Sequence, residues 1–137
     1  MNEEEFISVK KKSQDDFSVI DVKGHKIGGN AFTIFAGPCR IESEKQITQT
    51  ALAVKKAGAH ILRGGAFKPC TSPHSDWGRG EKALKELQMA GDAAGIPVIS
   101  EAMDVEQLDV VSKYSDILQI GTRNGQNYNL LSRLGDY

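Results

Sequence analysis

The chain has 137 residues, of which 17 are basic and 18 acidic, so its formal charge is −1. That length suits one domain with a modest core or a piece of a larger fold. The balanced charge gives no electrostatic reason to expect nucleic-acid or membrane-surface binding, and no apolar run approaches the roughly 18 residues that a membrane span needs. Cys39 and Cys70 lack zinc-finger spacing, and the charged N-terminus lacks a signal-peptide stretch, so we expect a cytoplasmic protein with reduced thiols.

The first elements differ in pattern from the later ones. Residues 1–16 form a charged N-terminal segment, and residues 17–137 are predicted to form one folded domain. Its opening stretch, "DFSVIDVKGHKIGG", alternates polar and apolar residues around a Lys-Gly turn, which predicts a short hairpin over Phe17–Ile27. The run "AFTIFA" at 31–36 then has the composition of a strand buried on both faces.

Strands and helices alternate through the rest of the chain. The segment 43–59 predicts a helix with a Ser-x-x-Gln start at Ser43 and a stop at Gly58. Three more units repeat this order, with strands predicted at 60–66, 96–102 and 116–121 and helices at 79–94, 105–114 and 126–134. Such alternation predicts a parallel sheet joined by right-handed crossovers. The four units look like half of a (β/α)₈ barrel, which typically takes about 250 residues, and the chain stops near the middle of one.

Polar side chains come after each predicted strand. The first strand leads into "GPCRIES", the second into Arg63 and the stretch 68–72, the third ends at Glu101, and the fourth leads into 121–124. Active sites of such barrels lie at the C-terminal ends of the strands, where these segments would converge. The cations and hydroxyls among them would suit one or two phosphorylated, anionic substrates.

Each of these residues also has an ordinary structural interpretation. Composition alone favours Cys39 as a small buried hydrophobe. Lys68 and Arg123 are compatible with solvated loop charges, and it is their co-occurrence that favours a site. Arg63 lies at a strand end, where an unpaired buried cation is costly, which favours function. His60 begins a strand at the opposite end of the sheet, and a structural role is the better hypothesis.

Four motifs taken together resemble a known family. "IFAGPCRIES", "ILRGGAFKPCTSP", "GIPVISEAMD" and "DILQIGTRNGQNYNLL" are similar to the first half of a bacterial DAHP synthase (3-deoxy-D-arabino-heptulosonate 7-phosphate synthase), and the resemblance runs from Phe17 to Leu134. It implies a (β/α)₈ barrel that condenses phosphoenolpyruvate with erythrose 4-phosphate, the first step of the shikimate pathway to aromatic amino acids. It also implies a divalent metal of the manganese, iron, cobalt or zinc class.

The resemblance assigns roles to the polar residues at the strand ends. Cys39 corresponds to the metal-liganding cysteine of the family. Arg63, Lys68 and Arg123 match the family positions that bind the phosphate and carboxylate of phosphoenolpyruvate. The resemblance implies that Arg63 and Lys68 are also catalytic. The loop that receives erythrose 4-phosphate is matched by Lys68, Pro69, Thr71 and Ser72.

One departure from the family lies in this loop. Where the family motif reads Lys-Pro-Arg-Thr-Ser, this chain has Cys70 in place of the arginine. Each charge-assisted hydrogen bond lost there would cost about 1.5 to 3 kcal/mol. Arg40, in place of a small polar residue, offers a compensating cation. A Cys39–Cys70 disulfide is an alternative if the two Cα atoms come within about 7 Å, and it would consume the metal ligand.

A second departure is that the later strands of the family have no counterpart in this chain. The family's remaining metal ligands, a histidine, a glutamate and an aspartate, belong to those strands, and a catalytic metal needs about three protein ligands. We therefore expect this chain to be inactive alone and to self-associate or to pair with a complementary half-barrel, which would cover its strand edges. Two alternatives stay open: a non-catalytic remnant that binds phosphorylated anions, and the sister enzyme that makes 3-deoxy-manno-octulosonate 8-phosphate, against which Lys68-Pro69 argues.

Overall fold

The computed structural model describes residues 13, 17–72 and 74–137. Apart from Ser13, the predicted charged segment 1–16 lies outside these described residues. The chain divides into two compact units, one up to Thr33 and one from Ile34 to Tyr137. None of the helices in the described part is long and apolar enough to cross a membrane.

The described part of the first unit contains the predicted hairpin. Strands β1 (Val19–Val22) and β2 (His25–Gly28) pair antiparallel, in a register that sets Val22 opposite His25. The two turn residues, Lys23 and Gly24, both have positive φ, as a two-residue hairpin loop requires. The backbone N–H of Gly24 donates to the Asp21 carboxylate, at 2.8 Å, and holds the turn.

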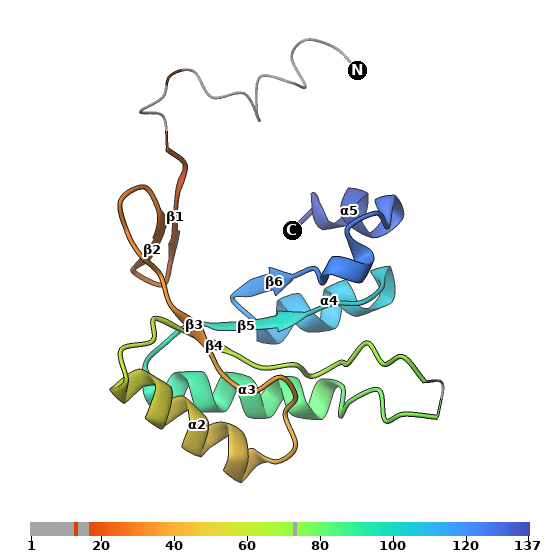
Figure 1. Ribbon diagram of the computed structural model, residues 1–137, viewed down its shortest axis with the longest axis horizontal. Coiled ribbons are helices and arrows are strands. Elements are labelled where there is room, and N and C mark those ends of the chain that lie inside the picture. The colour runs from red at the N-terminus through yellow and green to blue at the C-terminus, as the bar shows by residue number, and fades with distance from the viewer. Residues whose placement is uncertain (1–12, 14–16, 73) are drawn as a thin grey trace. The chain divides into compact units, whose positions relative to one another are not determined.

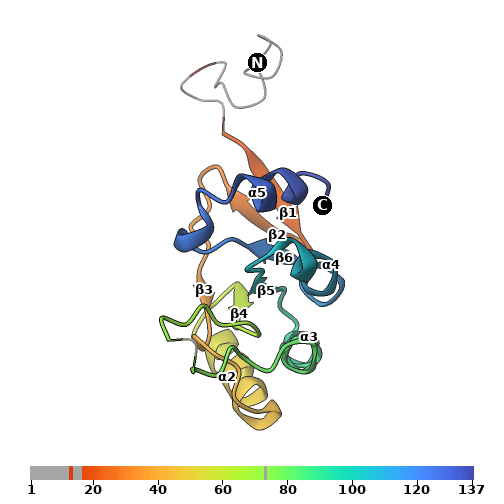
Figure 2. The ribbon, with the colours of Figure 1, turned by 90° about the vertical axis from the view of Figure 1, so that its right-hand side faces the viewer.

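The second unit is built on a parallel sheet. Its strands β3 (Phe35–Ala36), β4 (Ile61–Arg63), β5 (Val98–Glu101) and β6 (Ile117–Gln119) lie side by side in chain order. Because the order never reverses and such crossovers are right-handed, the connecting helices fall on one face of the sheet. The C-terminal ends of all four strands therefore point the same way, and the loops that leave them gather at one edge (Figures 1 and 2).

The helices begin and end close to the predicted signals. Helix α2 (Glu44–Lys56) is capped by the Ser43 hydroxyl, which accepts from the Gln46 N–H. Helix α3 (Glu81–Ala94) ends at Gly95, whose φ of 64° lies in the left-handed region. Figure 1 shows α2 and α3 side by side on one side of the strands. The remaining helices are α4 (Val105–Tyr114), the 3₁₀ turn η1 (Thr122–Asn124) and α5 (Tyr128–Leu134).

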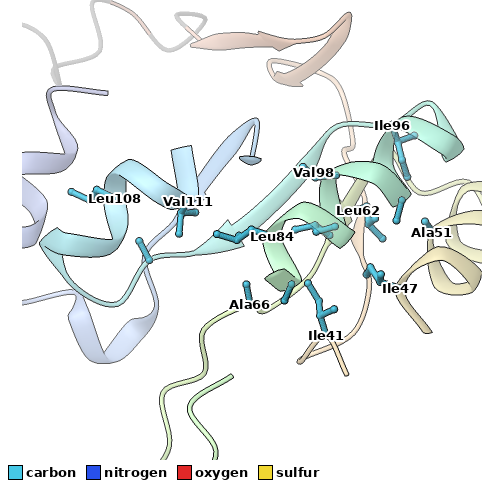
Figure 3. Packing of buried hydrophobic residues seen from close by; sticks show 14 of the residues in the cluster. Ile41, Ile47, Ala51, Leu62, Ala66, Leu84, Ile96, Val98, Leu108 and Val111 are labelled. Carbon is cyan, nitrogen blue, oxygen red and sulfur yellow. The ribbon is translucent and has the colours of Figure 1, made fainter. Parts of the chain in front are cut away.

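One hydrophobic core joins the helices to the sheet. Ile47 of α2, Leu84 of α3 and Val111 of α4 are fully buried and face side chains of the strands, such as Leu62 and Val98 (Figure 3). This packing holds β4 and β5 rigid, so that the loops that leave them start from fixed positions.

The prediction for the run at 31–36 is partly wrong. Only Phe35 and Ala36 belong to the sheet, and the side chains of Ile34 and Phe35 are 39% and 41% exposed rather than buried on both faces. The physical reason is position: among the described strands, β3 pairs with β4 alone and so lies at an edge of the sheet. Its composition is that of a central strand, but composition does not reveal how many neighbours a strand has.

Helix α3 starts two residues later than predicted. Arg79 and Gly80 precede it, and the positive φ of Gly80, 58°, ends the long loop that leaves β4. The Arg79 guanidinium forms a two-pronged ion pair with the buried Glu86 carboxylate of α3, with N–O distances of 2.5 and 2.8 Å. This pair anchors the far end of the loop to the helix.

Candidate active site

Two glycines bring the loops after β3 and β4 into contact. Gly37 has a φ of 151°, and a Cβ there would lie 1.9 Å from the carbonyl oxygen of Arg63. A Cβ on Gly65 would lie 2.3 Å from the carbonyl oxygen of Cys39. Larger residues at either position would push the two loops apart. The backbone N–H of Ile41 donates to the Gly65 carbonyl, at 3.0 Å, and closes the junction.

Arg63 ties three strand ends together. Its guanidinium donates to the carbonyl oxygens of Pro38 and Cys39, at 3.1 and 3.0 Å, in the loop after β3. It also lies 3.9 Å from the carboxylate of Glu101 at the end of β5, and 3.5 Å from the side-chain oxygen of Gln119 on β6. These contacts give the Arg63 cation partners at the strand end and hold its charge toward the polar edge of the sheet.

Lys68 and Cys39 form a close pair. The Lys68 ammonium donates to Sγ of Cys39, with Nζ and Sγ 2.5 Å apart. This hydrogen bond, helped by the Arg63 guanidinium, holds the pKa of the Cys39 thiol below its ordinary value, although desolvation acts in the opposite direction. Cys39 is exposed. The interpretation of Cys39 as a buried hydrophobe is therefore wrong, since it is an exposed thiol whose pKa is lowered by its neighbours.

The end of β5 contributes a buried acid next to the cations. The Glu101 side chain is 8% exposed and accepts from the Gln119 amide, with 3.3 Å between Nε2 and Oε2. A Cβ on Gly121 would lie 2.1 Å from Oε1 of Glu101, so a larger residue there would displace this carboxylate. The arrangement fixes Glu101 against the base of the loop that leads to Arg123.

An open pocket of about 470 Å³ lies at the C-terminal ends of the strands. Two predicted cations, Lys68 and Arg123, line it from different loops, and Arg123 donates to the carbonyl oxygen of Pro69 at 3.3 Å. The volume is that of a small-molecule site. Among the described residues, the lining consists of Lys68, Pro69, Glu101, Gln119, Gly121, Thr122 and Arg123.

Other predicted residues lie farther along the loop after β4. Thr71 and Ser72 are not among the residues that line the pocket, and the Ser72 hydroxyl accepts from the backbone N–H of His74 at 3.3 Å. Cys39 and Cys70 are both free thiols, so the disulfide considered from the sequence is not formed. Sγ of Cys70 contacts the carbonyl oxygen of Asp76 at 3.5 Å instead.

Sequence reasoning did not single out Gln119. It lies inside the apolar run "DILQIG", and a polar side chain in such a run is the signal that could have identified it. His60 has the structural role that the sequence suggested: it precedes β4, and its Nδ1 accepts from the backbone N–H of Ile34 at 3.0 Å.

A metal that this fold family implies would need more ligands than the described residues supply. Across residues 17–72 and 74–137, no group of three or more His, Cys, Asp or Glu side chains is placed to hold an ion. Cys39 is the soft ligand of the set, and its sulfur is engaged by Lys68. These residues alone do not fit a catalytic metal site with about three protein ligands.

Known proteins resemble most of this chain. A curated Phospho-2-dehydro-3-deoxyheptonate aldolase from Thermotoga maritima is 45% identical over 129 residues, which cover 94% of this chain and 38% of that protein. The crystal structure of the DAHP synthase of the same organism matches with a TM-score of 0.81 and 45% identity, covering 88% of this chain and 34% of that one. The structural match confirms the predicted fold class, a part of a (β/α)₈ barrel.

A more distant curated relative carries the name of the sister activity. A 2-dehydro-3-deoxyphosphooctonate aldolase from Syntrophobacter fumaroxidans is 29% identical over 127 residues, which cover 88% of this chain and 43% of that protein. The chain thus spans less than half the length of each of these relatives. The model of the DAHP synthetase I family matches residues 7–137. The chain therefore belongs to the DAHP synthetase I family.

Proposed function

We propose that this chain contributes the phosphoenolpyruvate-binding part of a DAHP synthase, an enzyme that condenses phosphoenolpyruvate with erythrose 4-phosphate in the shikimate pathway of the cytoplasm. The observation that carries the proposal is the pocket that both Lys68 and Arg123 line. Arg63 contacts Gln119, another residue of the lining. Phosphoenolpyruvate bears a phosphate and a carboxylate close together. Two or three cations from different loops are suited to hold both groups in one orientation.

The proposed roles derive from the position of each cation. Arg123 and Lys68 reach the pocket from loops that face each other, so one pairs with the phosphate and the other with the carboxylate. Arg63, held by the carbonyls of Pro38 and Cys39, is too constrained to follow a moving ligand and fixes the orientation of the carbon skeleton. Glu101 keeps Arg63 and Gln119 in place.

In the proposed reaction, C3 of phosphoenolpyruvate forms a bond to the aldehyde carbon of erythrose 4-phosphate. Water then adds to C2, and the C2–O bond breaks to release inorganic phosphate. The cations orient C3 toward the aldehyde and disperse the negative charge of the departing phosphate. In a complete site, Cys39 would be one ligand of a divalent metal, which would supply Lewis acidity. Further ligands would have to come from outside the described residues.

The test is a chimera in which this chain replaces the matching 129 residues of the Thermotoga maritima relative. We expect it to release phosphate from phosphoenolpyruvate when erythrose 4-phosphate is added, and not with arabinose 5-phosphate. Lys68→Ala and Arg123→Ala should each lower kcat/KM about tenfold or more, because a charge-assisted bond worth about 1.5 to 3 kcal/mol is lost. Lys85→Ala, at an exposed helix position, is the control.

Two results would count against the proposal. One is a chimera that has the circular-dichroism spectrum of a folded barrel and the thermal midpoint of the relative but no turnover. The other is turnover that Lys68→Ala and Arg123→Ala leave at the level of the Lys85→Ala control. Turnover with arabinose 5-phosphate in place of erythrose 4-phosphate would support the sister activity instead.

A further inference from the structure

Arg40 connects the loop after β3 to the long loop after β4. Its guanidinium forms an ion pair with the carboxylate of Asp76, 36 residues away in the chain. The backbone beneath it is fixed, because the Arg40 carbonyl accepts from the Gln46 side chain at 3.1 Å. Arg40 comes directly after Cys39, whose sulfur accepts a hydrogen bond from Lys68, a residue that lines the proposed phosphoenolpyruvate site.

Asp76 is the centre of a small polar cluster. Its Oδ1 accepts from the backbone N–H of Gly78 at 2.9 Å, and its carbonyl oxygen contacts Sγ of Cys70 at 3.5 Å. The Gly78 N–H and the Arg40 guanidinium hold the pKa of the Asp76 carboxyl below its ordinary value, so the group is a carboxylate at neutral pH. The Asp76 side chain is 59% exposed. A carboxylate so open to water forms a weak ion pair that another anion can replace.

The Arg40 guanidinium has more N–H donors than its ion pair with Asp76 uses. A guanidinium carries five N–H donors, and Nη2 is the one that reaches Asp76. Nε is shielded from solvent and has no hydrogen-bond partner among the described residues. Buried donors without partners are rare in proteins, so this donor is a feature of the Arg40 side chain that the contacts of the described part of the chain leave unexplained. The side chain as a whole is 31% exposed, so a ligand can reach it.

We propose that Arg40 binds the terminal phosphate of the second substrate, a short phosphorylated aldose, and that Asp76 occupies the guanidinium until that phosphate arrives. The inference rests on the proposed function, because a condensation of two phosphorylated substrates needs a second anion site beside the first. The described loops offer Arg40 for that site, since Lys68 and Arg123 line the first pocket. A phosphate dianion accepts two parallel N–H bonds from a guanidinium.

The proposal is tested by calorimetric titration of the full chain with erythrose 4-phosphate, with erythrose and with phosphoenolpyruvate. Trp77, the only tryptophan, is the residue after Asp76 and gives a fluorescence readout of the same events. Arg40→Ala should raise the Kd for erythrose 4-phosphate about tenfold or more and leave that for phosphoenolpyruvate within about twofold. Lys45→Ala, an exposed cation at the start of α2, should change neither.

Asp76→Asn separates phosphate binding from a merely structural role. Asparagine keeps an oxygen for the Gly78 N–H but removes the charge that competes with phosphate, so the Kd for erythrose 4-phosphate should fall by a factor of about two or more. If the Arg40–Asp76 pair only shaped the loop, Asp76→Asn would weaken binding in the same direction as Arg40→Ala. The thermal midpoint of each variant is measured as well, and affinities are compared only among variants whose midpoints match that of the parent.

The outcomes distinguish this inference from the proposed function. Suppose that the parent chain binds phosphoenolpyruvate and that the Arg40→Ala variant binds erythrose 4-phosphate as tightly as the parent does. The role of Arg40 would then be overturned, and the proposed function would stand. Weaker binding by Asp76→Asn, or equal affinities for erythrose 4-phosphate and erythrose, would also overturn the role of Arg40. A parent chain that binds neither phosphorylated compound would overturn the proposed function and this inference with it.

Discussion

The chemical environment of the Cys39 thiol depends on residues that are distant in the sequence. In the sequence it is a small residue after Gly-Pro, which composition assigns to a buried interior. In the structure it is exposed and receives a hydrogen bond from the ammonium of Lys68, 29 residues later. The loop after β4 brings the two together, and no local pattern encodes that distance. The sequence did contain the residue types, a thiol and a cation, each placed after a strand.

The Lys68–Cys39 pair makes a prediction about pH. Because the ammonium lowers the pKa of the thiol, alkylation of Cys39 by iodoacetamide should persist to lower pH than alkylation of an ordinary cysteine. Lys68→Met removes the main cause, so the pH profile of the rate should move to higher pH. The rates are measured in a Cys70→Ser background, with Lys45→Met as the control. Superimposable profiles for Lys68→Met and its parent would show that the pair does not form.

At the scale of elements, helix boundaries were the most predictable feature. The Ser43 cap, the Gly95 stop and the limits of α4 all match their sequence signals, because each rests on contacts within a few residues. The strand at 31–36 was less predictable, since its burial depends on how many strands flank it. Gln119 was missed for a related reason: its partners, Arg63 and Glu101, belong to other strands.

Helix α3 gives a prediction in which packing opposes helix propensity. Alanine is a better helix former than glycine by about 1 kcal/mol, so Gly91→Ala would stabilise an isolated helix. Here a Cβ at Gly91 would lie 2.2 Å from Cγ1 of Val98 and 3.0 Å from the Ile96 carbonyl oxygen. We expect a net loss of about 1 to 3 kcal/mol in the free energy of unfolding, measured with urea.

Asp92→Ala is the matched control for this substitution. It introduces the same residue one position along the same helix, at an exposed site near the negative end of the helix dipole. It should be neutral or slightly stabilising. If Gly91→Ala proved as stable as Asp92→Ala, the close approach of α3 to β5 would be wrong.

At the scale of the whole molecule, the sheet ends in two edge strands. Within the described unit from Ile34 onward, β3 pairs with β4 alone and β6 with β5 alone. Phe35 on β3 is 41% exposed, and edge strands with apolar side chains are templates for further pairing. The relatives that match this chain are more than twice as long, so they contain further chain that this one lacks. This agrees with the proposal that another polypeptide segment covers the edge strands.

We predict from these edges that the chain self-associates. Sedimentation velocity should show a weight-average mass that rises above 14.9 kDa with concentration. Phe35→Lys places a charge on the edge strand and should shift the distribution toward the monomer. Lys45→Met, on the exposed surface of α2, serves as the comparison. A single 14.9 kDa species at all concentrations would contradict the proposed association.

The central claim is that the cations at the strand ends form a phosphoenolpyruvate site, and calorimetric titration of the chain with phosphoenolpyruvate tests it most directly. We predict saturable binding that Lys68→Ala and Arg123→Ala each weaken about tenfold or more, while the exposed-site variant Lys85→Ala binds like the parent. Absence of binding by the folded parent chain, or one affinity shared by all four proteins, would contradict the account.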